Sequence, residues 1–203
     1  MRLRVVVTSF NAEKFLARTL ASIKRQKGVE FDLFVSDDCS TDKTVEVALQ
    51  HVPAANVIRR QTNLGVVDHS NLVIQELLTP DVDFFILHSH DDEDCHGRFW
   101  TQTQALIANP SLTYVTSPCL ERRGEGLGMT PYLKAEDMRA ILPTANLISA
   151  PAVMYNAKKL RKFLETEPFY RKEYETAEDY DQWLRLHAWG AQFTVLPEPQ
   201  VIY

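Results

Sequence analysis

The sequence has few cysteines and no long apolar run, and each absence excludes a class of protein. Its three cysteines, Cys39, Cys95 and Cys119, are widely spaced and form no CxxC pair. Such a set is not a disulfide framework, so we expect free thiols in a reducing compartment. The first apolar stretch is too short for a signal peptide, and no segment approaches the length of a membrane span. We therefore expect a cytoplasmic protein with no transmembrane segment in this chain. Association with a membrane through a partner or a missing segment stays open.

Clustered positive charge is also absent. The formal net charge is -5, and the pairs Arg59-Arg60 and Arg122-Arg123 are isolated. Binding to a nucleic-acid backbone needs clustered lysine and arginine, so we expect no nucleic-acid partner. Apolar residues make up 45% of the 203 residues, which is enough for the core of one large domain.

What the first half does contain is a regular alternation of apolar runs and amphipathic segments. The unbroken run from Leu3 to Thr8 is typical of a strand covered on both faces. We predict strands over residues 3–8, 31–36, 56–60 and 83–87, and helices over 12–25, 42–50 and 67–78. Strands separated by helices of this length form right-handed βαβ units, so we predict an α/β fold with a mainly parallel central sheet.

The second half is less regular. We predict helices over residues 98–108, 158–164 and 178–189, and strands over 112–117, near Val153 and over 192–196. Three glycines in a charged setting favour a mobile loop over residues 121–131. A phosphate-binding glycine loop is the alternative, but neither the GKS/T nor the GxGxxG pattern is present there.

Polar residues follow each of the first four predicted strands. Ligands of parallel α/β sheets bind beyond the carboxyl ends of the strands, so four polar clusters on one rim indicate a site. The clusters are Thr8-Ser9-Phe10-Asn11, Asp37-Asp38, Asn63-Leu64-Gly65 and the acidic run from Asp91 to Asp94.

The acidic run is the most informative of these clusters. It follows Phe84-Phe85-Ile86-Leu87 and reads His88-Ser89-His90-Asp91-Asp92-Glu93-Asp94. Adjacent carboxylates repel each other and cannot all be buried unpaired, so they favour an edge where a cation neutralises them. Oxygen ligands near solvent suit Mg²⁺ or Mn²⁺, which usually serve phosphate groups.

Two alternatives compete for this run. The spacing His88-x-His90-x-Asp92 resembles the HxHxDH run of metallo-β-lactamase-type hydrolases, in which imidazoles bind zinc. However, Glu93 stands in place of the last histidine, and His187 is the only histidine after His96. The other alternative is a solvated acidic turn packed over a histidine.

Two further carboxylate pairs lie at the starts of predicted helices. Asp37-Asp38 comes shortly before the helix over 42–50, and Glu178-Asp179 opens the helix over 178–189. Ser40 or Thr41 is a plausible helix cap, but a cap does not explain the adjacent Asp37 and Asp38, so we expect Asp38 to contact a ligand. Asp179 has two readings. It can form a capping box with Thr176, or it can act as a general base near the rim.

Taken together, the motifs resemble family 2 glycosyltransferases of the GT-A fold. The resemblance covers nearly the whole chain and rests on five ordered segments. These are Val5 to Leu16, Val35-Ser36-Asp37-Asp38-Cys39-Ser40-Thr41-Asp42-Lys43-Thr44 beside the family's vvDDgStDgT, Asn63-Leu64-Gly65, Asp91-Asp92 at the DxD position, and Glu178 to Arg185 beside the family's "ED…R" helix.

The resemblance implies a Rossmann-like αβα sandwich, with a nucleotide-sugar-binding half over residues 1–95 and an acceptor-binding half over residues 96–203. It implies inverting transfer from a nucleotide-diphosphate sugar, with UDP or dTDP favoured, to a hydroxyl of a glycan or lipid-linked acceptor, in cell-surface polysaccharide or glycan synthesis. Asp179 would be the general base, and Asp92 and Asp91 would hold Mn²⁺ or Mg²⁺. The implied nucleotide-binding residues are Thr8, Ser9, Phe10, Asn11, Asp38, Asn63, Gly65 and Asp91.

The sequence departs from the family pattern in three places. Ser89 replaces the first DxD aspartate, and Ser70 stands where an arginine commonly precedes Asn71. Family members usually continue beyond the position of Tyr203, so we expect a domain cut from a longer protein. Besides the zinc hydrolase with His88, His90 and Asp92, a sugar-nucleotide-binding domain without turnover is the remaining alternative.

Overall fold

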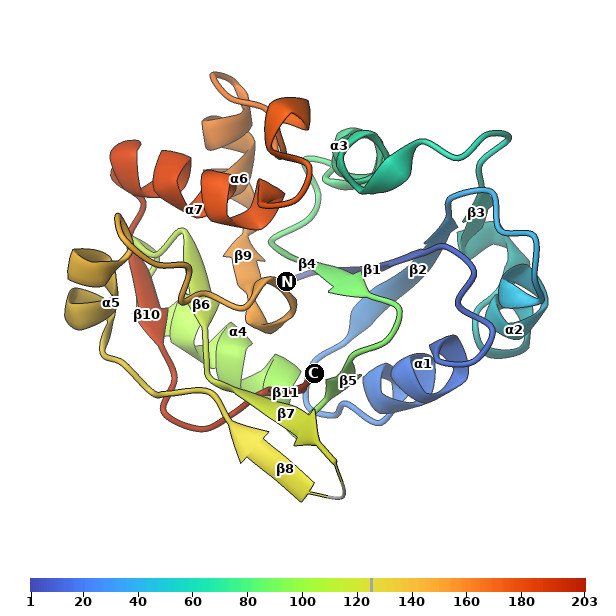
Figure 1. Ribbon diagram of the computed structural model, residues 1–203, viewed down its shortest axis with the longest axis horizontal. Coiled ribbons are helices and arrows are strands. Elements are labelled where there is room, and N and C mark those ends of the chain that lie inside the picture. The colour runs from blue at the N-terminus through green and yellow to red at the C-terminus, as the bar shows by residue number, and fades with distance from the viewer. Residues whose placement is uncertain (125) are drawn as a thin grey trace.

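A computed structural model describes residues 1–124 and 126–203 as an α/β fold built on a seven-stranded sheet (Figure 1). The strand order across this sheet is β10-β6-β9-β4-β1-β2-β3. Strand β1 pairs in parallel with both β2 and β4, and only β9 runs antiparallel to its neighbours in this sheet. The predicted α/β class with a mainly parallel sheet is therefore confirmed.

The helices and strands have the following bounds. The helices are α1 (Leu16–Lys24), α2 (Thr44–His51), α3 (Gly65–Leu77), α4 (Arg98–Ala108), α5 (Ala135–Ile141), α6 (Ala157–Leu164) and α7 (Glu178–Ala188), with short 3-10 turns η1 (Ala54–Asn56), η2 (Ala150–Ala152) and η3 (Lys172–Tyr174). The strands are β1 (Leu3–Ser9), β2 (Phe31–Asp37), β3 (Val57–Arg59), β4 (Phe84–Ser89), β5 (Glu93–Asp94), β6 (Tyr114–Thr116), β7 (Cys119–Arg123), β8 (Gly126–Met129), β9 (Met154–Asn156), β10 (Phe193–Val195) and β11 (Val201–Ile202).

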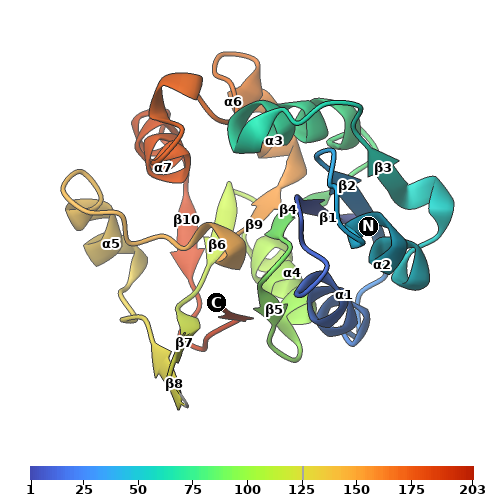
Figure 2. The same ribbon diagram turned by 45° about the vertical axis from the view of Figure 1, so that its right-hand side comes forward.

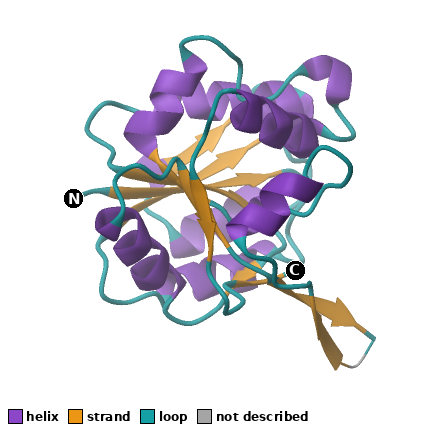
Figure 3. Ribbon diagram, turned by 90° about the vertical axis from the view of Figure 1, so that its left-hand side faces the viewer, coloured by secondary structure: helices purple, strands orange, loops and turns teal. Residues whose placement is uncertain are grey.

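Helices cover both faces of the large sheet, because its central strands are apolar on both sides. Alternate residues of a strand point to opposite faces. Val6 of β1 accordingly packs in one core with α3, α6 and α7, whereas Val5 and Val7 pack in a second core with α1 and α4. Figures 2 and 3 show these two helical layers with the sheet between them. The predicted αβα sandwich is confirmed.

A second, four-stranded sheet lies beyond the rim of the first, in the order β5-β11-β7-β8. Strand β11 pairs antiparallel with β5 and parallel with β7, so the last residues of the chain lie between the acidic turn and the β7–β8 hairpin. This hairpin projects from the body of the molecule (Figure 3).

The structure corrects several local predictions. Over residues 121–131 the predicted mobile loop is wrong for the described residues, because Leu120 to Arg123 pair in register with Gly126 to Met129. The part of that prediction that concerns residue 125 lies outside the described residues. The helix predicted over 12–25 begins at Leu16, after a turn in which Phe15 and Leu16 donate to the Ala12 carbonyl, and α5 was not predicted.

Both capping predictions are also wrong, because the side chains concerned are engaged elsewhere. Ser40 donates its hydroxyl to Asp37 and accepts from the Asn11 amide, so Asp42 accepts from the Thr44 amide at the start of α2 instead. Ala177 precedes α7 with no side-chain cap, so Thr176 and Asp179 do not form a capping box.

Within the described residues, no helix is long and apolar enough to cross a membrane.

A buried ionic network joins the acidic turn to the rest of the fold. Asp94 accepts hydrogen bonds from His88 Nε2, at 3.1 Å, and from Arg98 Nη1, and all three side chains are sealed from solvent. Arg98 also donates to the carbonyl of Pro151 at 2.6 Å. The network therefore fixes β4, β5, α4 and the η2 turn relative to one another.

We predict that Asp94→Ala lowers the free energy of unfolding by about 3–5 kcal/mol, because it leaves two buried cations without their carboxylate. Urea unfolding followed by circular dichroism measures this change. The control is Asp137→Ala, at an exposed aspartate of α5, which we expect to stay within about 0.5 kcal/mol of wild type. A similar small effect for both variants would contradict the structural role of the network.

Candidate active site

The carboxyl ends of β1, β2 and β4 meet at one rim of the large sheet. Parallel register places Ser9 beside Asp37, and Thr8 beside Ser36 and Ser89. The segments that follow these strands therefore lie side by side, as the sequence predicts. They line a chain of three adjoining hollows. We call them the nucleotide hollow, after the ligand that the sequence analysis predicts there, the middle hollow and the distal hollow.

The nucleotide hollow has a volume of about 230 Å³. Six of the predicted nucleotide-binding residues line it together, and they come from three different segments. Its lining residues are Thr8, Ser9, Phe10, Asp38, Asn63, Gly65, Val66, His69 and His90. Phe10 is 44% exposed, so one face of its ring is open to a ligand.

Asp38 is held rigidly in this hollow. Its carboxylate accepts hydrogen bonds from the backbone amides of Leu64, at 2.9 Å and 3.1 Å, and of Gly65, at 2.9 Å. Gly65 has a φ of +77°, a conformation that residues with a side chain rarely adopt. Asn63 donates its side-chain amide to the Asp38 carbonyl. The Asn63-Leu64-Gly65 segment thus orients the Asp38 carboxylate.

Two residues near Asp38 have structural partners. Asp37 is fully buried and accepts from the amide and the hydroxyl of Ser40, so it orders the turn after β2. The Asn11 side chain accepts from the amide of Thr41 at 3.0 Å, which ties the loop after β1 to the same turn. The proposed contact of Asn11 with a nucleotide stays a prediction.

The acidic turn contains one exposed and one buried candidate metal ligand. Asp91 is exposed, whereas Asp92 is only 3% exposed and its Oδ2 atom has no hydrogen-bond partner in the described structure. Burial, with a smaller contribution from the Asp91 charge, raises the pKa of Asp92 to about 6. A buried carboxylate oxygen without a hydrogen-bond partner can serve as a metal ligand, so the residues of this turn fit a divalent cation.

The same turn does not suit zinc. His88 Nδ1 lies 2.6 Å from the Ser89 carbonyl and Nε2 lies 3.1 Å from Asp94, and both of these partners can only accept. Both ring nitrogens must therefore donate, and Asp94 helps to raise the pKa of His88 despite its burial. A doubly protonated imidazole has no lone pair for a metal. Among the described residues, no three His, Cys, Asp or Glu side chains are grouped to hold one.

The middle hollow joins the other two. Its volume is about 250 Å³, and it shares Thr8 and Val66 with the nucleotide hollow and Asp179 and Tyr203 with the distal hollow. Ser89 and Glu178 also line it. The three hollows therefore adjoin one another along the rim of the sheet, and we call them together the trough.

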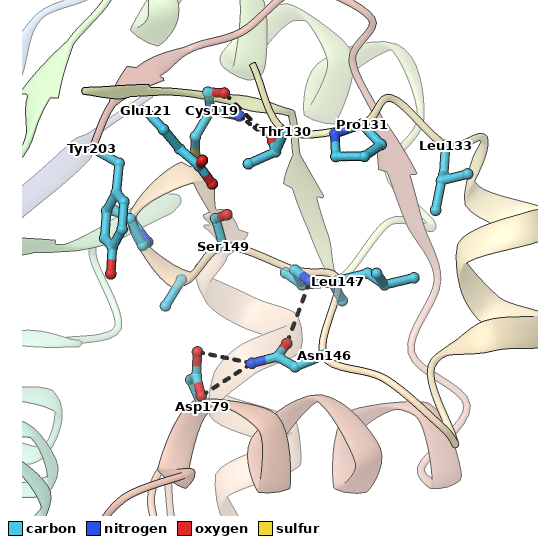
Figure 4. A pocket seen from close by; sticks show the side chains of 13 residues that line it. Cys119, Glu121, Thr130, Pro131, Leu133, Asn146, Leu147, Ser149, Asp179 and Tyr203 are labelled. Atoms are coloured by element: carbon cyan, nitrogen blue, oxygen red, sulfur yellow. Dashed lines mark hydrogen bonds between the residues drawn. The ribbon is translucent and has the colours of Figure 1, made fainter. Parts of the chain in front are cut away.

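Asp179 lies where the middle and distal hollows meet, at the start of α7. Its carboxylate accepts from the Asn146 side chain at 3.3 and 3.4 Å and from the amide of Tyr180 at 2.6 Å. Figure 4 shows Tyr203 and Asp179 on the same side of the distal hollow, with Asn146 beside Asp179. Burial raises the pKa of Tyr203, and the charges of Asp92, Asp91 and Asp179 raise it further. The three carboxylates therefore all lie near enough to the Tyr203 side chain to affect its pKa.

The distal hollow is the largest of the three, at about 380 Å³. Most of its lining comes from the second half of the chain and is apolar or neutral. The lining residues are Cys119, Glu121, Thr130, Pro131, Leu133, Asn146, Leu147, Ile148, Ser149, Ala150, Pro151, Asp179 and Tyr203 (Figure 4).

Among the polar trough residues that the sequence analysis missed, four lie close to predicted site residues. His69, Asn146 and Tyr203 follow no recognisable motif, so only the folded chain places them there. Glu178 was quoted as part of a motif but given no role. It lines the middle hollow, and burial raises the pKa of its carboxyl group.

Comparison with known proteins identifies relatives of this site and fold. The family model described as Glycosyl transferase family 2 matches residues 4–167. A teichoic acid poly(glycerol phosphate) polymerase of Staphylococcus epidermidis is 30% identical over 96 residues, which are 45% of this chain and 13% of the polymerase. The poly(ribitol-phosphate) beta-N-acetylglucosaminyltransferase TarS of Staphylococcus aureus is 35% identical over 69 residues, 32% of this chain and 12% of TarS.

Solved structures agree on the fold. Residues 1–349 of S. aureus TarS, in complex with UDP-GlcNAc, align with all of this chain at 22% identity and a TM-score of 0.74, over 58% of that structure. The mannosyltransferase PcManGT of Pyrobaculum calidifontis, in complex with GDP-Man and Mn²⁺, aligns with 99% of this chain at 13% identity and a TM-score of 0.72, over 56% of that structure. The chain thus spans under two thirds of these relatives, and the fold is that of GT-A glycosyltransferases.

The family model covers most of the chain, and its match agrees with both the fold and the motifs at the rim. The chain is a member of glycosyl transferase family 2.

Proposed function

We propose that this chain transfers a sugar, with inversion, from a nucleotide-diphosphate sugar to an acceptor hydroxyl, and that UDP or dTDP is the favoured nucleotide. The observation that carries this proposal is the trough of adjoining hollows, which has Asp38 at one end and Asp179 where the middle and distal hollows meet. A trough of this kind holds a nucleotide, a diphosphate and an acceptor in line. Residues 1–95 form the nucleotide-binding half and residues 96–203 the acceptor-binding half.

The nucleotide hollow suits the nucleoside of the donor. Phe10 offers an exposed ring face for stacking, Asp38 offers a fixed acceptor, and Thr8 and Ser9 lie beside them. In support, TarS, with a similar fold, has been solved with UDP-GlcNAc and with UDP. The sugar and diphosphate then lie in the middle hollow, beside Ser89.

The residues of the acidic turn fit Mn²⁺ or Mg²⁺. Asp92 presents a buried oxygen without a partner, and the exposed Asp91 adds a second carboxylate. These two carboxylates would hold the cation, and Mg²⁺ sites in phosphate-processing proteins usually use one or two protein carboxylates. When bound, such a cation neutralises charge on the departing nucleotide diphosphate. A metal-bound relative of this fold is PcManGT, whose structure contains Mn²⁺.

Asp179 is suited to act as the general base. It borders both the middle hollow, where the sugar lies, and the distal hollow, where the acceptor enters. Asn146 and the Tyr180 amide donate to its oxygens and fix their direction. From this position the carboxylate takes the proton of the attacking hydroxyl, so inversion needs one in-line step.

The distal hollow suits a glycan or lipid-linked acceptor, in the synthesis of a cell-surface polysaccharide or glycan. Its mainly apolar lining with a few polar groups is typical of a site that holds a sugar or a chain of carbon atoms. The names of two relatives support a polymer acceptor, since TarS is named a poly(ribitol-phosphate) beta-N-acetylglucosaminyltransferase and the S. epidermidis protein a teichoic acid poly(glycerol phosphate) polymerase.

We predict that UDP or dTDP with Mn²⁺ raises the melting temperature. At a ligand concentration of about 100 times Kd the stabilisation is about 2.7 kcal/mol, which is roughly 5–10 °C for a chain of this size. Asp92→Asn should lose the metal-dependent part of the shift, and Asp137→Asn should keep all of it. Stabilisation by zinc alone, with no response to any nucleotide, would sink the transferase assignment in favour of the zinc hydrolase.

We predict that, without metal or nucleotide, the contribution of Asp92 to the stability of wild type falls as pH rises from about 4 to about 6. The raised pKa of Asp92 means that the folded state holds this proton more tightly than the unfolded state, so stability is lost between the unfolded and the folded pKa and stays lost above pH 6. Asp92→Asn should therefore unfold with a free energy up to about 3 kcal/mol higher than wild type at pH 8 and equal to it at pH 4. Urea titrations at both pH values measure this, and equal stability at pH 8 would contradict it.

We predict that Asp179→Asn keeps donor binding and loses transfer by about 10²- to 10⁴-fold, because the amide cannot accept the hydroxyl proton. Donor binding is measured by calorimetry and transfer by release of nucleotide diphosphate in the presence of acceptor. Glu173→Gln, at an exposed glutamate outside the trough, is the control.

If Glu178→Gln loses transfer while Asp179→Asn retains it, the base is Glu178 instead. Donor binding without any turnover by wild type would favour the inactive binding domain.

A further inference from the structure

His69 lines the nucleotide hollow but belongs to none of the motifs that carry the family resemblance. It lies in the second turn of α3 and is 3% exposed, yet it borders the same hollow as Asp38. Its Nε2 atom lies 2.8 Å from the hydroxyl of Ser36. Its Nδ1 atom has no hydrogen-bond partner in the described structure, and it is not sealed from solvent. Because the ring lines the hollow, Nδ1 is open to it.

A chain of hydrogen bonds decides which nitrogen of His69 carries the proton. Arg60 donates from Nη2 to the Ser36 hydroxyl oxygen at 3.4 Å, and Glu76 fixes the guanidinium of Arg60 through two hydrogen bonds. The Ser36 hydroxyl hydrogen then has one acceptor within reach in the described structure, which is His69 Nε2. If Nε2 donated instead, that hydrogen would have no acceptor. The network therefore assigns the proton to Nδ1.

The imidazole is neutral in this position. Burial lowers the pKa of His69, and the nearby Arg60 charge lowers it further. These two effects outweigh the charges of Asp38 and Asp37, which raise it. A neutral ring with its proton on Nδ1 presents one N–H donor to the hollow.

Asp38 presents the complementary group. Oδ2 accepts from the amides of Leu64 and Gly65, whereas Oδ1 accepts only from Leu64 in the described structure. A carboxylate oxygen has two lone pairs, so Oδ1 keeps one for a ligand. The nucleotide hollow thus offers one fixed acceptor and one fixed donor.

We propose that His69 is a specificity-determining residue, which donates its Nδ1–H to a base carbonyl while Asp38 accepts the adjacent ring N–H. This inference rests on the proposed nucleotide-sugar function. Uracil and thymine present that N–H and carbonyl side by side. Cytosine presents the reverse pattern, a ring nitrogen with a lone pair beside an amino group, so it would leave both protein groups unpaired.

The test compares binding of UDP and CDP, which differ only at this edge of the base, by calorimetry in the presence of Mn²⁺. We expect wild type to bind UDP at least about tenfold more tightly than CDP. His69→Leu removes the donor, so UDP binding should weaken about tenfold and the preference for UDP over CDP should shrink to the part that Asp38 alone contributes. The control is His51→Leu, at a half-buried histidine of α2 whose side chain lies outside the hollow, and it should keep the wild-type preference.

A second variant tests the proton assignment and does not depend on the folding of His69→Leu. Ser36→Ala removes the hydroxyl that holds the proton on Nδ1, so the ring can also present a lone pair there. CDP should then bind more tightly than it binds wild type, while UDP binds less tightly. A structural role alone would weaken both nucleotides equally.

Three outcomes overturn the proposal. If UDP binds wild type but neither His69→Leu nor Ser36→Ala changes the ratio of UDP to CDP affinity, His69 does not select the base. If wild type binds both nucleotides equally, no such selection exists. If wild type binds neither nucleotide, the proposed function fails and this inference fails with it.

Discussion

The parallel pairing of β1 with β2 and β4 is the constraint on which the trough depends. Each pair brings two carboxyl ends to the same rim, in a register that sets Thr8 beside Ser36 and Ser89 and Ser9 beside Asp37. A shift of one residue in either pair would turn every side chain of that strand to the opposite face. The apolar residues on both faces of β1 oppose such a shift, because each face packs in its own core. The geometry of the rim is therefore stabilised by the core beneath it.

Charge at the rim is balanced in two different ways. Below the acidic turn, Asp94 is neutralised inside the protein by Arg98 and His88, and this lowers the pKa of Asp94 despite its burial. Asp92 is buried two residues away with an unpartnered oxygen, and its pKa is raised. The first arrangement stabilises the fold, whereas the second leaves a carboxylate oxygen without a hydrogen-bond partner in the described structure. A buried carboxylate without a partner is costly to keep, which is consistent with a role in binding.

The sequence predicted the parts of the structure that depend on local pattern. Apolar runs gave the central strands of the sheet, and the motifs placed Asp38 and Asp179 on one trough. The rest depends on contacts between distant segments. The β7–β8 hairpin is joined to the second sheet through β11, about 80 residues further on, and no local pattern in the glycine-rich segment indicates that partner.

The residues that the sequence analysis missed or misassigned also depend on contacts between distant segments. Ser40 looks like a helix cap in the sequence, but its hydroxyl accepts from the Asn11 amide once β1 and β2 are adjacent. His69 lies on a helix that any amphipathic pattern would predict. Its relation to Ser36 and Asp38 becomes visible only when α3 packs on the sheet.

The position of β11 has a practical consequence for handling the protein. Tyr203 lines the middle and distal hollows, so any affinity tag or fused domain joined to it would emerge at the mouth of the trough. Met1 lies at the opposite end of β1, roughly 20 Å from the rim for a strand of this length. Purification handles and immobilisation linkers are therefore better attached at the amino terminus, where they leave the trough accessible.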